Sequence, residues 1–107
     1  MTTFDKRKEG FEKKFAHDQE ARFRAEARRN KLLGLWAAEL MGRTGQAAQD
    51  YARTVAVADL DKPGDEDVFA KVKADLIAAG VERSDHQIRR TMDELLVRAR
   101  DEIANES

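Results

Sequence analysis

Apolar side chains recur along this chain at spacings of three, four and seven residues, and this spacing limits what the chain can fold into. Phe4, Phe11 and Phe15 follow it near the N-terminus. Near the C-terminus it is followed by Ile88, Met92, Leu95, Ala99 and Ile103. Residues at these spacings share one face of an α-helix, whereas a half-buried strand alternates every second residue. No segment shows the strand period, so the sequence predicts an all-α fold.

Glycine and proline divide this pattern into four segments. Gly42 and Gly45 flank a predicted turn, residues 59–64 contain the only proline, and Gly80 ends the third segment. The connections are short, which favours a four-helix bundle. The predicted helices are a first from Thr3 that continues through Met41, a second from Gln46 to Ala58, a third capped by Asp65, and a fourth that begins with a capping box of Ser84 and Gln87.

The chain can bury only a modest core. It has 107 residues, one tryptophan, one tyrosine and no cysteine, and 38% of its residues are charged, so we expect one small domain without disulfides. A stripe formed by Ala16, Phe23 and Ala27 is predicted to lead into the bundle. The side chains predicted to face the core from the first three helices are Leu32, Leu33, Leu35, Trp36, Leu40, Met41, Ala48, Tyr51, Ala52, Val55, Ala56, Val68, Phe69, Val72, Leu76 and Ile77.

The first 31 residues combine a narrow apolar face with an excess of positive charge. They carry ten of the twenty basic side chains and six of the twenty-one acidic ones, so their net charge is +4 against −5 for the remainder. Burying Phe4, Phe11 and Phe15 stabilises by about 1.5–3 kcal/mol each, whereas ordering the backbone costs roughly 1–2 kcal/mol per residue. We therefore expect a long amphipathic arm, mobile until it docks on the rest of the chain or on another protein.

The residues that carry chemistry form no catalytic constellation. His17 and His86 lie on different predicted helices, and neither has a His or Glu four residues later. The aspartates of residues 59–67 suggest a calcium loop, but the glutamate that such a loop needs at its twelfth position is missing. Residues 42–45 lack the length and the lysine of a phosphate-binding loop. We expect neither a metal site nor an enzyme.

Apolar runs in this chain are short. None approaches the roughly 18 residues that span a bilayer, and charged residues occupy the place of a signal peptide's apolar region. We therefore expect a soluble, cytoplasmic protein without membrane insertion.

A basic cluster at the end of the N-terminal stretch fits a solvated helix face better than a nucleic-acid site. Two of its arginines have an acidic residue one helical turn earlier, and the net charge of the whole chain is −1. The alternative function that this cluster leaves open is a helical adaptor that binds nucleic acid or another acidic partner through its basic N-terminal half. The cluster consists of Arg22, Arg24, Arg28, Arg29 and Lys31.

Three segments of the chain resemble a known protein family. The segments KFAHD (14–18), EARRNKLLGLWAAE (26–39) and PGDEDVF (63–69) are similar to segments of the ζ subunit of alphaproteobacterial F1Fo-ATP synthases and occur in the same order. The resemblance covers essentially the whole chain. It implies a four-helix protein whose N-terminal segment inhibits ATP hydrolysis, in a manner like that of the mitochondrial ATPase inhibitor protein.

The resemblance also implies a division of labour, with residues 1–19 as the inhibitory arm and residues 20–107 as the bundle body. The arm is expected to enter the cleft between a catalytic β subunit and its α neighbour, against the γ shaft, and to block rotation in the hydrolytic direction. The resemblance implies no required cofactor, weak adenine-nucleotide binding at an unlocated site, and a position on F1 at the cytoplasmic side of the inner membrane. The partner-binding residues that it implies are Phe4, Phe11 and Phe15 as apolar anchors, and Asp5, Arg7, Glu12 and His17 as polar contacts.

Overall fold

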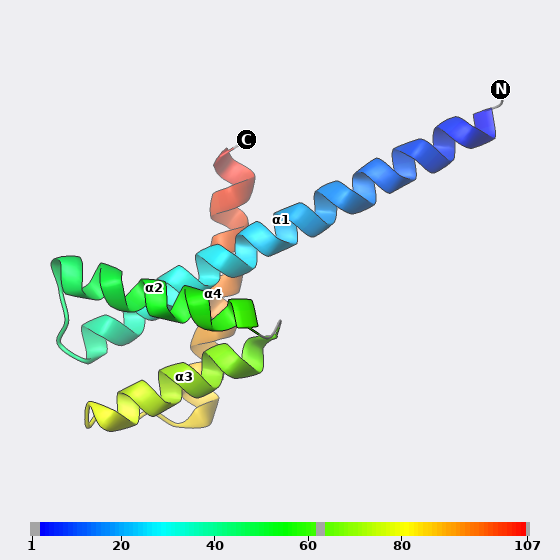
Figure 1. Ribbon diagram of the computed structural model, residues 1–107. Helices are drawn as coiled ribbons and strands as arrows, with labels where there is room; N and C mark the ends of the chain where they lie inside the picture. The colour runs from blue at the N-terminus through cyan, green and yellow to red at the C-terminus, as the bar shows by residue number, and fades with distance from the viewer. Residues whose placement is uncertain (1–2, 62–63, 107) are drawn as a thin grey trace.

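The computed structural model contains four α-helices (Figure 1). It describes the backbone of residues 3–61 and 64–106 and the side chains of residues 19–58 and 64–106. No strand occurs in these backbone ranges, so the predicted all-α class is confirmed. The helices are α1 (Thr3–Leu40), α2 (Gly45–Asp61), α3 (Asp65–Ala78) and α4 (Asp85–Glu106).

The ends of α1 and α3 follow from local chemistry. Gly42, just after α1, has a φ of 80°, a left-handed conformation that is open to glycine. The N–H of Arg43 then donates to the carbonyl of Ala38 at 2.8 Å, the bond that closes a Schellman turn. Helix α3 ends in the same way at Gly80, which has a φ of 76°. Both predicted helix ends are therefore confirmed.

The starts of α3 and α4 differ in their caps. At α4 the N–H of Gln87 donates to Ser84 Oγ at 3.1 Å, and the N–H of Ser84 donates to Gln87 Oε1 at 2.9 Å, so the capping box is confirmed. At α3 the prediction was wrong, because Gly64 precedes the helix without a side-chain cap and Asp65 is its first helical residue. The Asp65 carboxylate pairs with Arg29 of α1 instead.

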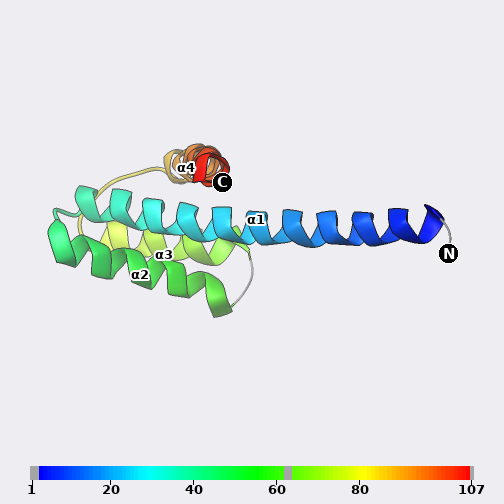
Figure 2. The same ribbon diagram turned by 90° about the horizontal axis from the view of Figure 1, so that it is seen from above.

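Helix α1 is the axis of the fold. It contacts the other three helices, whereas α2 and α4 make no contact with each other over the described residues. Figure 2 shows α2 and α3 on one side of α1 and α4 crossing it on the other. The N-terminal part of α1 continues beyond the other helices, which makes the molecule 65 Å long and about 25 Å wide.

The core lies mainly where α1, α2 and α3 meet, and α4 closes it from the other side of α1. Gly34 brings α1 and α2 together, because a Cβ at this position would lie only 2.6 Å from the Cα of Ala52. Trp36, Leu40 and Met41 pack partly buried against this core. The buried side chains of the core are Leu33, Ala37, Ala38, Tyr51, Val55, Val68, Phe69, Val72, Leu76, Ile88 and Met92.

Some predicted core positions are exposed. Phe23 and Ile77 are each 65% exposed, and Ala27 is exposed as well. The prediction that Phe23 and Ala27 lead into the bundle was therefore wrong, while the side chain of Ala16 lies outside the described residues. Ile77 follows the buried Leu76 by about 100° around α3, so its side chain points away from the buried direction of Leu76. In this stretch of α1 the buried side chains are Ala25, Arg29 and Asn30.

Candidate partner-binding site

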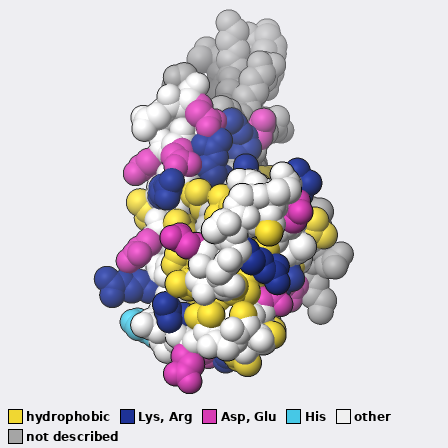
Figure 3. All heavy atoms as spheres, turned by 90° about the vertical axis from the view of Figure 1, so that its left-hand side faces the viewer, with side chains coloured by type: hydrophobic (Ala, Val, Ile, Leu, Met, Phe, Trp, Pro, Cys, Tyr) yellow, Lys and Arg dark blue, Asp and Glu magenta, His cyan; other side chains and the backbone are white. Residues whose placement is uncertain are grey.

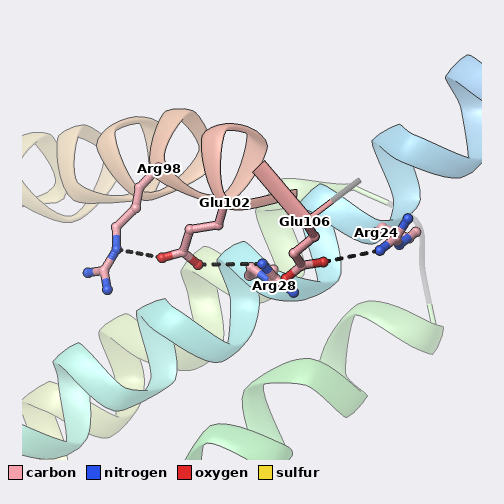
Figure 4. A network of polar contacts seen from close by, with 5 residues as sticks. All are labelled: Arg24, Arg28, Arg98, Glu102 and Glu106. Atoms are coloured by element: carbon pink, nitrogen blue, oxygen red, sulfur yellow. Dashed lines mark hydrogen bonds and ion pairs between the residues drawn. The ribbon is translucent and has the colours of Figure 1, made fainter. Parts of the chain in front are cut away.

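Five charged side chains join the last turns of α4 to α1 (Figure 4). Arg28 contacts Glu106, and its Nη1 lies 3.7 Å from Oε1 of Glu102. Arg24 reaches the same Glu106 at 3.3 Å, and Arg98 pairs with Glu102 at 3.0 Å. These side chains are between 30% and 61% exposed, so each pair contributes only about 0.2–1 kcal/mol.

Helical spacing places these groups opposite one another. Arg24 and Arg28 are four residues apart on α1, and Glu102 and Glu106 are four residues apart on α4, so each pair lies on one face of its helix. One turn before Glu102, Ala99 is fully buried, and its small side chain allows α4 to come close to α1. The crossing therefore presents two carboxylates to two guanidinium groups.

Arg29 follows Arg28 in the sequence, but its side chain is buried, whereas that of Arg28 is partly exposed. Its side chain is 2% exposed, and its Nη2 lies 2.8 Å from Asp65 Oδ1 while its Nε donates to Asn30 Oδ1 at 2.8 Å. A buried guanidinium is tolerated because these acceptors take hydrogen bonds from two of its nitrogens and the carboxylate offsets its charge. The expectation of a solvated basic face was therefore wrong at Arg29.

A second polar contact joins α2 to α3. The hydroxyl of Tyr51 donates to Asp75 Oδ2 at 2.8 Å, and Lys71 Nζ lies 3.0 Å from the same oxygen. The guanidinium carbon of Arg43 lies 5.2 Å from the centre of the Tyr51 ring. Burial, reinforced by the hydrogen bond to Asp75, raises the pKa of Tyr51 well above its ordinary value. The hydroxyl therefore stays neutral and acts as a donor.

A third contact, between α3 and α4, had no sequence signal of its own. Arg89 makes two hydrogen bonds of 3.0 Å to the carboxylate of Glu66 and stacks on Phe69, with 3.9 Å from its guanidinium carbon to the ring centre. The hydrogen bond from Arg89 lowers the pKa of Glu66. The two residues are 23 positions apart, so helical spacing could not have found this pair.

The predicted inhibitory residues all fall on the N-terminal part of α1. The backbone there is helical from Thr3, and α1 passes the predicted arm boundary at residue 19 without interruption. The division into arm and body and the partner-binding roles stay predictions. The side chains of Phe4, Asp5, Arg7, Phe11, Glu12, Phe15 and His17 lie outside the described residues.

Comparison with known proteins decides the family. The sequence model of the ATPase inhibitor subunit zeta family matches residues 1–102. The chain belongs to this family. A structure determined by solution NMR is similar to the zeta-family chain, with a TM-score of 0.70 and 41% sequence identity over 79% of this chain and 96% of that one. No curated protein gives a significant match.

Membership of the zeta family fixes the function at a coarse level. The family consists of ATPase inhibitor subunits, which implies that this zeta-family chain binds an ATP synthase and acts on it as an inhibitor. The predicted resemblance is therefore confirmed.

Other kinds of site find little support in the described part of the zeta-family chain. No group of three or more His, Asp or Glu residues there is arranged to hold a metal ion, and no described helix is long and apolar enough to cross a membrane. Acidic and basic side chains are intermixed over the face in Figure 3. A shallow hollow of about 700 Å³ lies beside the turn between α3 and α4, with Lys73, Ile77 and Arg83 in its lining. Weak nucleotide binding stays a prediction without a located site.

Proposed function

We propose that this chain inhibits ATP hydrolysis by F1Fo-ATP synthase through residues 1–19 of α1, inserted between a catalytic β subunit and its α neighbour against the γ shaft. The observation that carries the proposal is the length and continuity of α1. Its 38 residues correspond to about 57 Å of helix, and Figure 1 shows its N-terminal part leading away from the other three helices.

The physical argument starts from helix nucleation. The C-terminal half of α1 is fixed by packing against α2, α3 and α4, so the helix can extend toward Thr3 without forming a new nucleus. Gly10 costs about 1 kcal/mol relative to alanine, but it does not end the helix. An arm that is already helical loses less conformational entropy when it enters a cleft, and this favours binding.

Inhibition then needs no covalent chemistry. If the cleft accepts the arm in only one rotational state of the enzyme, binding of the arm stabilises that state selectively. The other rotational states bind the arm less tightly and are therefore less populated. Phe4, Phe11 and Phe15 would supply the apolar contacts, and Asp5, Arg7, Glu12 and His17 the polar ones. The body of the protein would remain outside the cleft, on F1 at the cytoplasmic side of the inner membrane.

Deleting residues 1–19 tests the proposal directly. We expect the shortened chain to keep the helical signal of its body in circular dichroism, because the described core lies entirely in residues 25–99. Inhibition of ATP hydrolysis by purified alphaproteobacterial F1 should be abolished. A folded, shortened chain that still inhibits would refute the role of the arm.

Single-residue variants sharpen this test with a control in the same helix. Each of Phe11→Ala and Phe15→Ala should raise the half-inhibitory concentration about ten- to a hundredfold, since a buried Phe side chain contributes about 1.5–3 kcal/mol. Phe23→Ala is the matched control, because Phe23 is an exposed phenylalanine on α1 beyond the predicted arm. Equal losses in all three variants would contradict the assignment of the anchors.

A further inference from the structure

We propose that Arg24 and Arg28 form a docking site for an acidic helix of the ATPase, and that the last turn of α4 masks this site in the free protein. The inference rests on the proposed function, because it names a second surface by which the chain would hold the same target. The occupant is an α-helix that carries carboxylates four residues apart.

The spacing of the masked groups identifies the occupant. Glu102 and Glu106 lie one helical turn apart and face Arg24 and Arg28, which are also one turn apart (Figure 4). The end of α4 is therefore itself an acidic helix bound to these two arginines. Any helix that presents two carboxylates with this spacing can replace it without leaving a guanidinium group unpaired.

The end of α4 is held weakly enough to be replaced. Beyond the buried Ala99, Ile103 is the only large apolar side chain of α4, and it is only partly buried. The ion pairs that also hold this turn are partly exposed, so their separate contributions are small and decrease as salt is added. Helix ends with few buried apolar contacts open at a low free-energy cost. Local opening of this turn would expose both arginines.

The neighbouring basic groups show which arginines are available for exchange. Arg29 is buried and bound to Asp65, so it cannot take part. Lys31, by contrast, is exposed and makes no ion pair with the described residues. It lines a hollow of about 270 Å³ between α1 and α2 together with Arg53. Arg53 is paired with Asp50 at 4.0 Å, and both it and Lys31 line the side of α1 that faces α2, so neither takes part in the site that faces α4.

The position of the site suggests what the exchange would do. Arg24 and Arg28 lie in the part of the body that is next to the proposed arm along α1, so a partner helix bound there would hold the body beside the cleft that the arm enters. In the exchange, the two arginines leave one pair of carboxylates and bind another, so the net change in free energy is close to zero. The inserted arm therefore supplies most of the binding free energy. Because a partner can bind only while the last turn of α4 is detached from the arginines, the apparent affinity of the docking site scales with the fraction of time that this turn is detached.

The test removes the mask and leaves the site intact. The full-length variant E102Q/E106Q should inhibit the ATPase at a concentration about fivefold lower than the unmodified chain, because the competing carboxylates are gone. R24Q/R28Q loses the contact with the partner and the contact with the mask together, so it should inhibit at about the same concentration as the unmodified chain and at a concentration about fivefold higher than E102Q/E106Q. The charge-matched control is E94Q/D101N, which removes two exposed carboxylates of α4 that make no ion pair with the described residues of α1.

A second measurement works without the ATPase. A fluorescently labelled, alanine-based helical peptide with glutamates four residues apart should bind E102Q/E106Q about fivefold more tightly than the unmodified chain at low salt, and should not bind R24Q/R28Q. Identical behaviour of E102Q/E106Q and E94Q/D101N in both assays would overturn the inference. Tighter binding of a single-stranded oligonucleotide than of the peptide would overturn it too. If the unmodified chain does not inhibit, the proposed function fails, while the peptide assay still decides on the docking site.

Discussion

The two sides of α1 are built differently. Toward α2 and α3, contact depends on close apolar packing at Gly34 and Leu33 and on the ion pair between the buried Arg29 and Asp65, whose side chain is 57% exposed. Toward the end of α4, contact depends on partly exposed ion pairs of Arg24 and Arg28. The first kind of contact is strong and cannot be exchanged, whereas the second is weak and adaptable. One helix thus carries a permanent interface and a replaceable one.

The difference teaches that neighbouring residues of one type can have unlike roles. Arg28 and Arg29 follow each other in the sequence, yet Arg29 is buried and Arg28 is partly exposed. A rotation of about 100° between consecutive helical residues is enough to separate them. Variants of the two sides therefore offer a direct way to test whether the contrast is energetic as well as geometric.

The largest effect is expected from the two adjacent arginines. Arg29→Ala should destabilise the protein by about 2–4 kcal/mol, because it opens a cavity in the core and removes the hydrogen bond to Asn30. Arg28→Ala should cost about 1 kcal/mol or less. Urea denaturation of both variants measures the difference. Equal losses would show that the two sides of α1 are energetically alike.

A second prediction compares two glycines of the same helix. Gly34→Ala should destabilise by about 1–3 kcal/mol, because the new Cβ would meet the backbone of Ala52 and push α2 away from α1. Gly10→Ala replaces a glycine in the N-terminal part of α1 and should favour the helix by about 1 kcal/mol. Circular dichroism melts of both variants distinguish them. A neutral Gly34→Ala would contradict the close approach of α1 and α2.

The smallest effect concerns the hydrogen bond between α2 and α3. Tyr51→Phe should cost about 1 kcal/mol near neutral pH, because Asp75 loses a donor. The pKa of Tyr51 is raised in the folded chain, so its contribution is complete below the ordinary pKa of about 10 and is lost as the pH rises toward the higher, folded value. The stability difference between the two proteins should therefore shrink above about pH 10.

Absorbance provides an independent measurement for the same residue. Tyr51 is the only tyrosine of the chain, so the tyrosinate signal reports on it alone. In the folded protein this signal should grow at a higher pH than in the denatured protein. Titration of both states at the same pH would contradict the buried hydrogen bond.

Local signals predicted much of this fold. Gly42, Gly80 and the capping box of Ser84 and Gln87 act within a few residues of the chain, so their structural role can be read from the sequence. The helix faces of α3 and α4 were also largely correct, because Val68, Val72, Ile88 and Met92 are buried as the spacing predicted. These features need no knowledge of which helix packs where.

Contacts between distant helices escaped prediction. Phe23 was expected inside because it is apolar, yet it is 65% exposed, and Arg29 was expected outside because it is charged, yet it is buried and paired with Asp65 of α3. Asp65 was assigned to a cap because of its neighbours in the sequence, whereas a partner 36 residues away determines its role. For the candidate site, the spacing of Arg24 and Arg28 was visible, but their pairing with α4 depends on how the helices cross.

The continuity of α1 has a mechanical consequence. Helix α1 has no break between residue 3 and residue 40, so its two ends cannot rotate about the helix axis independently of each other. When one face of the N-terminal segment is bound, the direction in which the body projects is therefore fixed as well. Each residue added near position 20 would turn the body by about 100°, whereas four added residues would nearly restore its original heading. The number of residues in α1 therefore determines both the distance between the N-terminal segment and the body and the angle between them about the helix axis.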